Sequence, residues 1–211
     1  MQHQTDAWNQ HYQRPKSKQL YPDENLVRLL KQIENDKANH FDFSKSTVLD
    51  YGFGSGRHLR LLTDSGCKRI IGCEASEVAL NEAKPIFTGI DLRLVTSTIQ
   101  RLPFDTGSFD LILCWGVLHY LDDAGQKHLV SEFQRLLRTG GFVVGTLRSA
   151  NDTHFKHSDV GNTNIQLFDQ NQAESLLRQT FDQVQLGHSE RTILGRVDLK
   201  ISHWFFKAQK T

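Results

Sequence analysis

Residues 48–57, Val-Leu-Asp-Tyr-Gly-Phe-Gly-Ser-Gly-Arg, place three glycines at alternate positions between a short apolar run and a helix-like segment. Glycine has no Cβ, so Gly52, Gly54 and Gly56 allow positive φ angles and let a ligand approach the backbone closely. The helix that follows would direct free N–H groups at that ligand. A dinucleotide-binding fingerprint has its third glycine one residue later, where this chain has Arg57. The stretch therefore predicts a strand–turn–helix unit that holds a nucleotide-like ligand without a pyrophosphate.

A second strand pattern, residues 69–74, ends in a carboxylate. Its sequence is Arg-Ile-Ile-Gly-Cys-Glu, and Glu74 follows Gly52 by 22 residues. An acid at this spacing can accept hydrogen bonds from both hydroxyls of a ribose. The alternative is an ordinary solvated acid at the start of the next helix. The spacing and the strand-end position favour ribose binding.

Apolar runs alternate with helical patterns from residue 47 onward, which predicts a parallel sheet covered on both faces. The expected strands are residues 47–51, 69–74, 91–96, 109–115 and 141–147. A helix is expected from a cap at Asp122 or Asp123 to the glycines at 140 and 141. Two further strand patterns, from Val184 onward and over residues 200–206, are joined by a short connection around Gly195, which requires antiparallel pairing.

Four motifs occur in the order and spacing typical of one enzyme family. They are the glycine turn, the strand ending at Glu74, the run Arg-Leu-Pro-Phe-Asp-Thr-Gly-Ser-Phe-Asp at residues 101–110, and Cys-Trp-Gly-Val-Leu-His-Tyr at residues 114–120. Over about residues 45–147 the chain resembles the class I S-adenosylmethionine-dependent methyltransferases, and in particular small-molecule enzymes of the kind that act in ubiquinone and menaquinone biosynthesis. The resemblance implies an α/β, Rossmann-like, doubly wound sheet of seven mostly parallel strands with a C-terminal antiparallel hairpin. It also implies an N-terminal helical cap segment over residues 1–45 and a methyltransferase domain over residues 46–211.

The same resemblance implies that S-adenosyl-L-methionine is the cofactor and S-adenosyl-L-homocysteine its product. The implied cofactor-binding residues are Asp50, Gly52, Phe53, Gly54, Gly56, Glu74, Ala75, Thr98, Ile99, Cys114 and Tyr21. Asp50 would hold the glycine turn and reach the amino group of the methionine, or would only cap the turn. Tyr12 or Tyr21 could hydrogen-bond the cofactor carboxylate, or the N-terminal aromatic residues could simply dock a helix.

The chain departs from the family at the adenine pocket. Thr98 stands where many relatives carry an aspartate that accepts from the adenine amino group. A threonine oxygen can accept this hydrogen bond but carries no charge. The backbone N–H of Ile99 could still donate to the ring.

His119 follows the fourth expected strand, which faces the transferred methyl group in relatives. Methyl transfer is an in-line displacement in which positioning supplies most of the acceleration, and a base is needed only for a protonated nucleophile. We expect His119 to act as that base or to pack under the next helix. Four other histidines, at positions 154, 157, 188 and 203, lack acidic partners at ligand spacing, so no metal site is expected.

The composition limits the classes of partner that the protein is expected to bind. Lys and Arg number 25 against 24 Asp and Glu, a formal charge of +1, and no basic run suggests nucleic acid. The three cysteines show no paired spacing and are expected to be reduced. No apolar run approaches the ~20 residues that span a bilayer, so a cytoplasmic protein with no membrane association is expected.

The sequence thus predicts a methyltransferase acting on a small-molecule acceptor. The alternative is a catalytically silent member of the fold that serves as a binding or regulatory subunit. A nicotinamide-dependent oxidoreductase is disfavoured by Arg57 and by the antiparallel C-terminal pattern. The acceptor, its reacting atom and the oligomeric state are left open.

Overall fold

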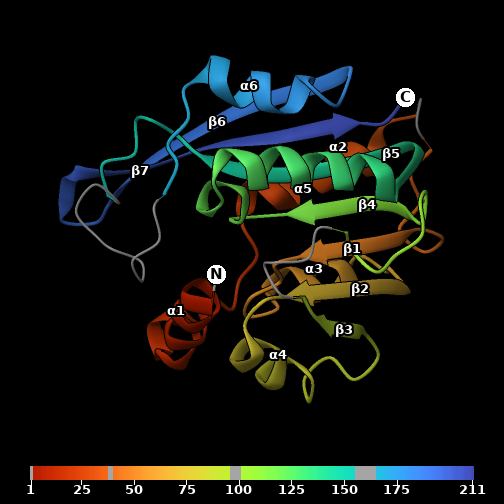
Figure 1. Cartoon of the computed structure of the whole chain (residues 1–211), viewed down its shortest axis with the longest axis horizontal. Coiled ribbons are helices and arrows are strands. Elements are labelled where there is room, and N and C mark those ends of the chain that lie inside the picture. The colour runs from red at the N-terminus through yellow and green to blue at the C-terminus, as the bar shows by residue number, and fades with distance from the viewer. Residues whose placement is uncertain (1, 38–39, 96–100, 155–164) are drawn as a thin grey trace.

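One seven-stranded mixed sheet organises the chain, with helices on both of its faces (Figure 1). The computed structural model describes residues 2–37, 40–95, 101–154 and 165–211. The strands are β1 (Thr47–Tyr51), β2 (Arg69–Glu74), β3 (Asp91–Leu94), β4 (Phe109–Cys114), β5 (Leu137–Arg148), β6 (Gln183–Ile193) and β7 (Arg196–Gln209). Their order is β3-β2-β1-β4-β5-β7-β6, with the first five parallel and β7 antiparallel to both of its neighbours. The predicted fold class is confirmed.

Both faces of the central strands are buried, which explains their continuous apolar runs. Neighbouring residues such as Val48 and Leu49, or Ile112 and Leu113, belong to the two opposite core clusters. The helices are α1 (Gln2–Gln13), α2 (Glu24–Asn35), α3 (Arg57–Asp64), α4 (Glu77–Ala83), α5 (Asp123–Leu136) and α6 (Gln170–Arg178). Apolar residues of α2, α3 and α4 fill one cluster, and those of α5 and α6 fill the other.

The helix expected to run to Gly140 ends earlier. Asp122 caps α5 by accepting from the Gly125 N–H at 2.8 Å, as expected, but the chain becomes extended at Leu137. Leu137 pairs with Phe109 of β4, and the register then shifts before Leu111 pairs with Phe142. Strand pairing with β4 therefore takes Leu137 into β5, although its apolar side chain also fits the helical stripe. Strand β4 likewise ends one residue before the expected position, at Cys114.

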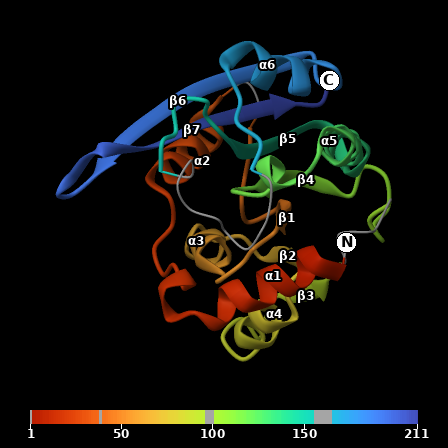
Figure 2. The same ribbon diagram turned by 60° about the vertical axis from the view of Figure 1, so that its left-hand side comes forward.

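The N-terminal segment divides into two differently packed helices. Four side chains of α2 are buried in the core beside the sheet, namely Leu26, Leu29, Leu30 and Ile33. Helix α1 instead lies beside α4, outside the sheet layers (Figure 2). A cap boundary at residue 45 stays a prediction, but the buried face of α2 belongs to the same core as β1 and α3.

The C-terminal hairpin extends beyond the helices that cover the sheet (Figure 1). Leu194 and Val197, near its turn, are exposed. The three cysteines are free thiols in buried positions. Within the described ranges, no helix is long and apolar enough to cross a bilayer.

Candidate cofactor and acceptor site

A cavity of about 980 Å³ lies at the carboxyl ends of the parallel strands. Residues that follow β1, β2 and β4 line one part of it, and residues of β5, β6 and β7 line another. This is the edge where open α/β sheets place their ligands.

The glycine turn between β1 and α3 has the conformation that its sequence predicts. The φ angles of Gly52, Gly54 and Gly56 are +76°, +55° and +78°. An added Cβ would also overlap a neighbour at each position: Val117 at Gly52, the Tyr12 hydroxyl at Gly54 and the Phe87 ring at Gly56. The turn therefore requires glycine for both conformation and space. Phe53 and Gly54 line the cavity.

Glu74 ties the glycine turn to the end of β2. Its Oε2 accepts from the Gly54 N–H at 2.8 Å, and its Oε1 accepts from the N–H groups of Ala75 at 2.8 Å and Ser76 at 2.9 Å. Burial raises the pKa of this carboxyl, and the three backbone donors counteract the rise. A carboxylate has about four lone-pair positions, so one on Oε2 stays available toward the cavity. As placed, Glu74 can accept one ribose hydroxyl without breaking a backbone bond.

Asp50 lies buried at the end of β1, directly behind the turn. Its Oδ2 has no hydrogen-bond partner among the described residues. Burial, followed by the charge of Glu74, raises the pKa of Asp50 to about 7. A buried carboxylate oxygen without a donor is costly, and a ligand ammonium group would relieve that cost. The open cradle, the acceptor position on Glu74 and the orphaned oxygen of Asp50 together fit the ribose and amino groups of S-adenosylmethionine.

Helix α1 forms the outer wall at the glycine turn. Asn9 Oδ1 accepts from the Ser76 hydroxyl at 2.8 Å and from the Val78 N–H at 3.3 Å, which fastens α1 to the start of α4. Tyr12 reaches Gly54 and lines the cavity, whereas Tyr21 is 82% exposed and is not among the lining residues. The structure thus brings Tyr12 to the site and leaves Tyr21 outside it.

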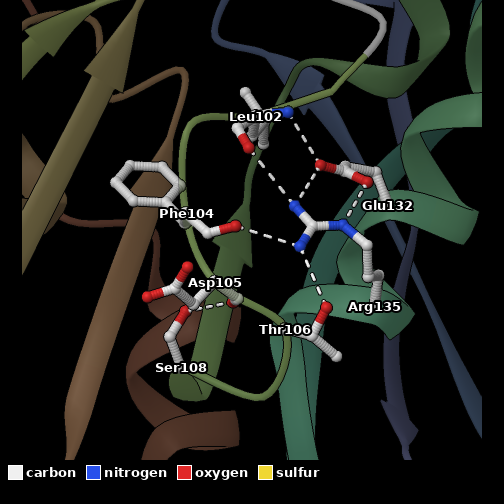
Figure 3. A network of polar contacts seen from close by, with 7 residues as sticks. All are labelled: Leu102, Phe104, Asp105, Thr106, Ser108, Glu132 and Arg135. Carbon is white, nitrogen blue, oxygen red and sulfur yellow. Dashed lines mark hydrogen bonds and ion pairs between the residues drawn. The ribbon is translucent and has the colours of Figure 1, made fainter.

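The adenine positions Thr98 and Ile99 lie outside the described residues. The loop that follows them is held by Arg135 of α5, as Figure 3 shows. The Arg135 guanidinium donates to the carbonyls of Leu102 at 3.2 Å and Phe104 at 3.0 Å and to the Thr106 hydroxyl at 3.2 Å. It also pairs with Glu132, which in turn accepts from the Leu102 N–H at 2.7 Å. Sequence reasoning missed this clamp, whose only signal was an acid and an arginine three residues apart on one helix.

Residues that follow the end of β4 extend the lining of the cavity beyond the glycine turn. Cys114 is fully buried and does not line the cavity, whereas Trp115, Gly116 and Val117 do. The Gly116 N–H donates to Thr146 Oγ1 of β5 at 2.9 Å. The backbone that would face a methyl donor therefore begins one or two residues beyond Cys114.

His119 lies in the short 3-10 helix Leu118–Tyr120 and lines the cavity. The side chain is buried, and one of its nitrogens is hydrogen-bonded to the backbone of Thr146, while Nδ1 has no partner in the described part of the chain. Burial and the nearby Arg148 charge hold the pKa of His119 well below its usual value. The imidazole is therefore neutral at physiological pH, with Nδ1 available to accept a proton.

Of the histidines at positions 154, 157, 188 and 203, His154 and His203 line the cavity, and the His203 ring centroid lies 6.4 Å from that of His119. His188 bonds the hydroxyls of Ser202 and Ser149, and the strand register puts it on the opposite face of the sheet from His203. His157 lies outside the described residues. Within the described ranges, no group of three or more potential ligands could hold a metal ion.

Known proteins resemble this chain in the region of the site. Residues 48–141 match the model of a family described as a methyltransferase domain. The chain is 40% identical over 104 residues to a tRNA U34 carboxymethyltransferase of Aeromonas salmonicida, covering 47% of this chain and 31% of that protein. It is 33% identical over 97 residues to an uncharacterized methyltransferase of Synechocystis, covering 46% and 44% of the two chains. The chain thus spans less than half the length of these curated relatives.

Solved structures extend the likeness to nearly the whole fold. A structure from work on the conversion of a disulfide bond into a thioacetal group during echinomycin biosynthesis aligns with 99% of this chain and 92% of its own, with a TM-score of 0.73 and 15% identity. A possible histamine N-methyltransferase from Thermotoga maritima aligns over 89% and 98%, with a TM-score of 0.62 and 17% identity.

Residues 48–141 therefore match a methyltransferase domain, and the fold around them is the Rossmann-like fold of the class I S-adenosylmethionine-dependent methyltransferases. The resemblance that the sequence motifs indicated is confirmed at the level of this class. The finer expectation, a branch related to ubiquinone and menaquinone biosynthesis, stays a prediction.

Proposed function

We propose that this protein transfers a methyl group from S-adenosylmethionine to a small acceptor, and that S-adenosylhomocysteine is the product. One observation carries the proposal. The glycine turn and Glu74 share a single cavity with Gly116 and His119, so a donor on the turn and an acceptor beyond β4 would meet in one space.

The residues around the turn would bind and orient the cofactor, which supplies an electrophilic methyl group on a positively charged sulfur. Glu74 would accept a ribose hydroxyl, and Asp50 would receive the methionine ammonium group directly or through water. Tyr12 and Trp8 would exclude water from the outer side, since both line the cavity and Trp8 packs edge-on against Tyr120 at 4.8 Å. Holding the reacting groups in line supplies most of the acceleration in such a displacement.

His119 would remove a proton from acceptors that need deprotonation. Its second nitrogen is engaged with the backbone of Thr146, which fixes the ring and presents Nδ1 as the basic atom. An acceptor that is already ionised would need no such help.

Surface charge favours a small acceptor over RNA. The formal net charge is only +1, and nine of the 17 exposed Lys and Arg residues in the described ranges are paired with acids, as in Lys18–Glu82, Lys127–Asp123, Arg178–Glu174 and Lys200–Glu190. RNA binding relies on cations that are free to contact phosphates. The relatives named for tRNA make RNA the competing acceptor, and a transfer assay should therefore include it.

Calorimetric titration with S-adenosylhomocysteine tests the cofactor assignment. We expect binding in the micromolar range and, at a hundredfold excess over Kd, about 2.7 kcal/mol of added stability. No heat and no thermal shift at millimolar ligand would refute the proposal. A screen with methyl-labelled cofactor, metabolite pools and bulk tRNA then separates the acceptor classes, and cofactor binding without any transfer would favour the silent, regulatory alternative.

A further inference from the structure

The part of the cavity beyond Gly116 is walled by one face of the sheet. In the strand register, Arg148 of β5 lies opposite His203 of β7, and His203 lies opposite Ser189 of β6. Arg191 of β6 lies opposite Ile201 of β7. Directly paired residues project from the same face of a sheet. All five of these residues line the cavity. The antiparallel hairpin thus completes a wall that begins on β5.

Arg148 is a buried cation whose guanidinium is held by a residue outside the cavity. Its side chain is 7% exposed, and its Nη1 donates to Asp152 Oδ2 at 2.9 Å. Asp152 is fully buried, also accepts from the Ser202 N–H at 2.8 Å, and does not line the cavity. Tyr120 is a second hydrogen-bond partner of the guanidinium. The guanidinium is therefore oriented by the protein while its carboxylate partner stays out of the cavity.

The other polar groups of this wall are donors or neutral. Arg191 is exposed, and its guanidinium makes no ion pair or hydrogen bond among the described residues. Burial and the charge of Arg148 lower the pKa of His203 to about 4, so its ring is neutral. Two acids at the start of α2 also line the cavity: Asp23, whose charge acts on His203 and which accepts from the Asn25 N–H at 2.9 Å, and Glu24, which pairs with Arg28. Two guanidinium groups with hydroxyl and imidazole neighbours form a wall suited to an acceptor-rich, anionic group.

Three aromatic rings add to the lining of the same cavity. Trp115 is largely buried, His58 packs edge-on against it with ring centroids 6.1 Å apart, and Phe205 lies next to His203 on the same face as Thr146. All three rings line the cavity. Flat apolar walls favour a planar ligand body.

We propose that the acceptor is a small planar molecule bearing a carboxylate or comparable anion, which Arg148 and Arg191 bind. The inference rests on the proposed function, since it assigns the acceptor half of that site. The bound anion would fix the acceptor's orientation, with its opposite end directed toward Gly116 and His119.

Fragment binding to the protein as it exists tests this assignment. Benzoate, phenyl phosphate, benzamide and benzylamine are titrated by NMR, with and without saturating S-adenosylhomocysteine. We expect benzoate or phenyl phosphate to bind at least fivefold more tightly than benzamide, and the better of the two identifies the anion. Equal binding of benzamide, or a preference for benzylamine, would overturn the proposal.

Two variants test whether the anionic fragment binds at Arg191 and Arg148. Arg191→Gln should weaken the anionic fragment at least fivefold and leave S-adenosylhomocysteine affinity unchanged. The paired change Arg148→Gln with Asp152→Asn removes the buried ion pair as a unit, which avoids an unpaired buried charge, and should abolish fragment binding. Arg196→Gln is the matched control, because Arg196 lies on the same hairpin, pairs with Asp198 and does not line the cavity.

The outcomes separate this inference from the proposed function. Unchanged fragment affinity in both the Arg191 and the paired variant would refute the acceptor wall even if S-adenosylhomocysteine binds. Fragment binding that depends on Arg191 in a protein that binds no S-adenosylhomocysteine would support the wall and refute the methyltransferase assignment.

Discussion

The two halves of the cavity are built in different ways. In the half proposed to hold the cofactor, backbone geometry dominates: three glycines with positive φ, and Glu74, which accepts from three backbone N–H groups, lie within residues 52–76. In the acceptor half, side chains dominate, and they come from β5, β6 and β7, which meet only through strand pairing. A backbone-built site depends on local conformation, whereas a side-chain-built site depends on long-range register. The two halves should therefore respond differently to substitution.

The largest effect is expected where backbone geometry is strictest. Gly54→Ala places a Cβ at φ +55°, against the Tyr12 hydroxyl. We expect S-adenosylhomocysteine affinity to fall more than ~100-fold, because the turn must shift or expel Tyr12. Calorimetry measures the loss. Gly89→Ala is the control, since nothing lies within 4 Å of an added Cβ there and its φ is not positive; equal affinity of both variants for the ligand would show that the turn is not the cofactor site.

Asp50 should make the free protein less stable as pH rises. Its folded pKa of about 7 lies above the ordinary value of 3.8, so the folded state holds a proton that the unfolded state has lost between those values. Stability is lost as pH increases through this window, by roughly 1.4 kcal/mol for each pKa unit of difference. Asp50→Asn should thus raise the melting temperature relative to the parent at pH 8 but not at pH 4, and should weaken cofactor binding. A melting difference that does not change with pH would contradict the raised pKa.

His119 tests whether side-chain chemistry is needed in the acceptor half. With a protonated acceptor, His119→Ala should lower kcat about 100-fold and leave cofactor affinity near the parent value. Since its pKa lies well below 6.5, the parent's rate should show no ionisation step near that pH. Turnover equal to the parent's at every pH would limit His119 to packing and leave proximity as the source of the rate.

Glu74 is expected to give the smallest of these effects and to act on both binding and folding. Glu74→Gln removes a charged acceptor worth about 1.5–3 kcal/mol per hydrogen bond, so S-adenosylhomocysteine affinity should fall at least ~10-fold. It also turns an amide NH₂ toward backbone N–H donors, so the free variant should melt at a lower temperature. Glu77→Gln, on the exposed first turn of α4, should change neither. Parental affinity in the Glu74 variant would exclude ribose binding by this residue.

The contrast between the halves also marks what could be read from the chain. The glycine spacing, Glu74 and the apolar runs predict the parallel strands and the place where a cofactor would bind, because the responsible residues are close in sequence and impose their conformation locally. Leu137 was misassigned because its apolar side chain suits both a helix stripe and a buried strand, and its partner Phe109 is distant in sequence. Tyr12 and Tyr21 were equivalent candidates in sequence, and only the docking of α1 on α4 brings Tyr12 to Gly54.

The sequence by itself determined the class of fold, the glycine turn and the acid at the end of β2, since these follow from backbone preferences and short spacings. Only the tertiary structure decided that Arg148, His203 and Arg191 share a wall, that Arg135 clamps the loop after residue 100, and that Asp50 has an orphaned oxygen. Those features depend on strand register, helix docking and burial. Each is set by the packing of segments far apart in the chain, where no local pattern records the partner.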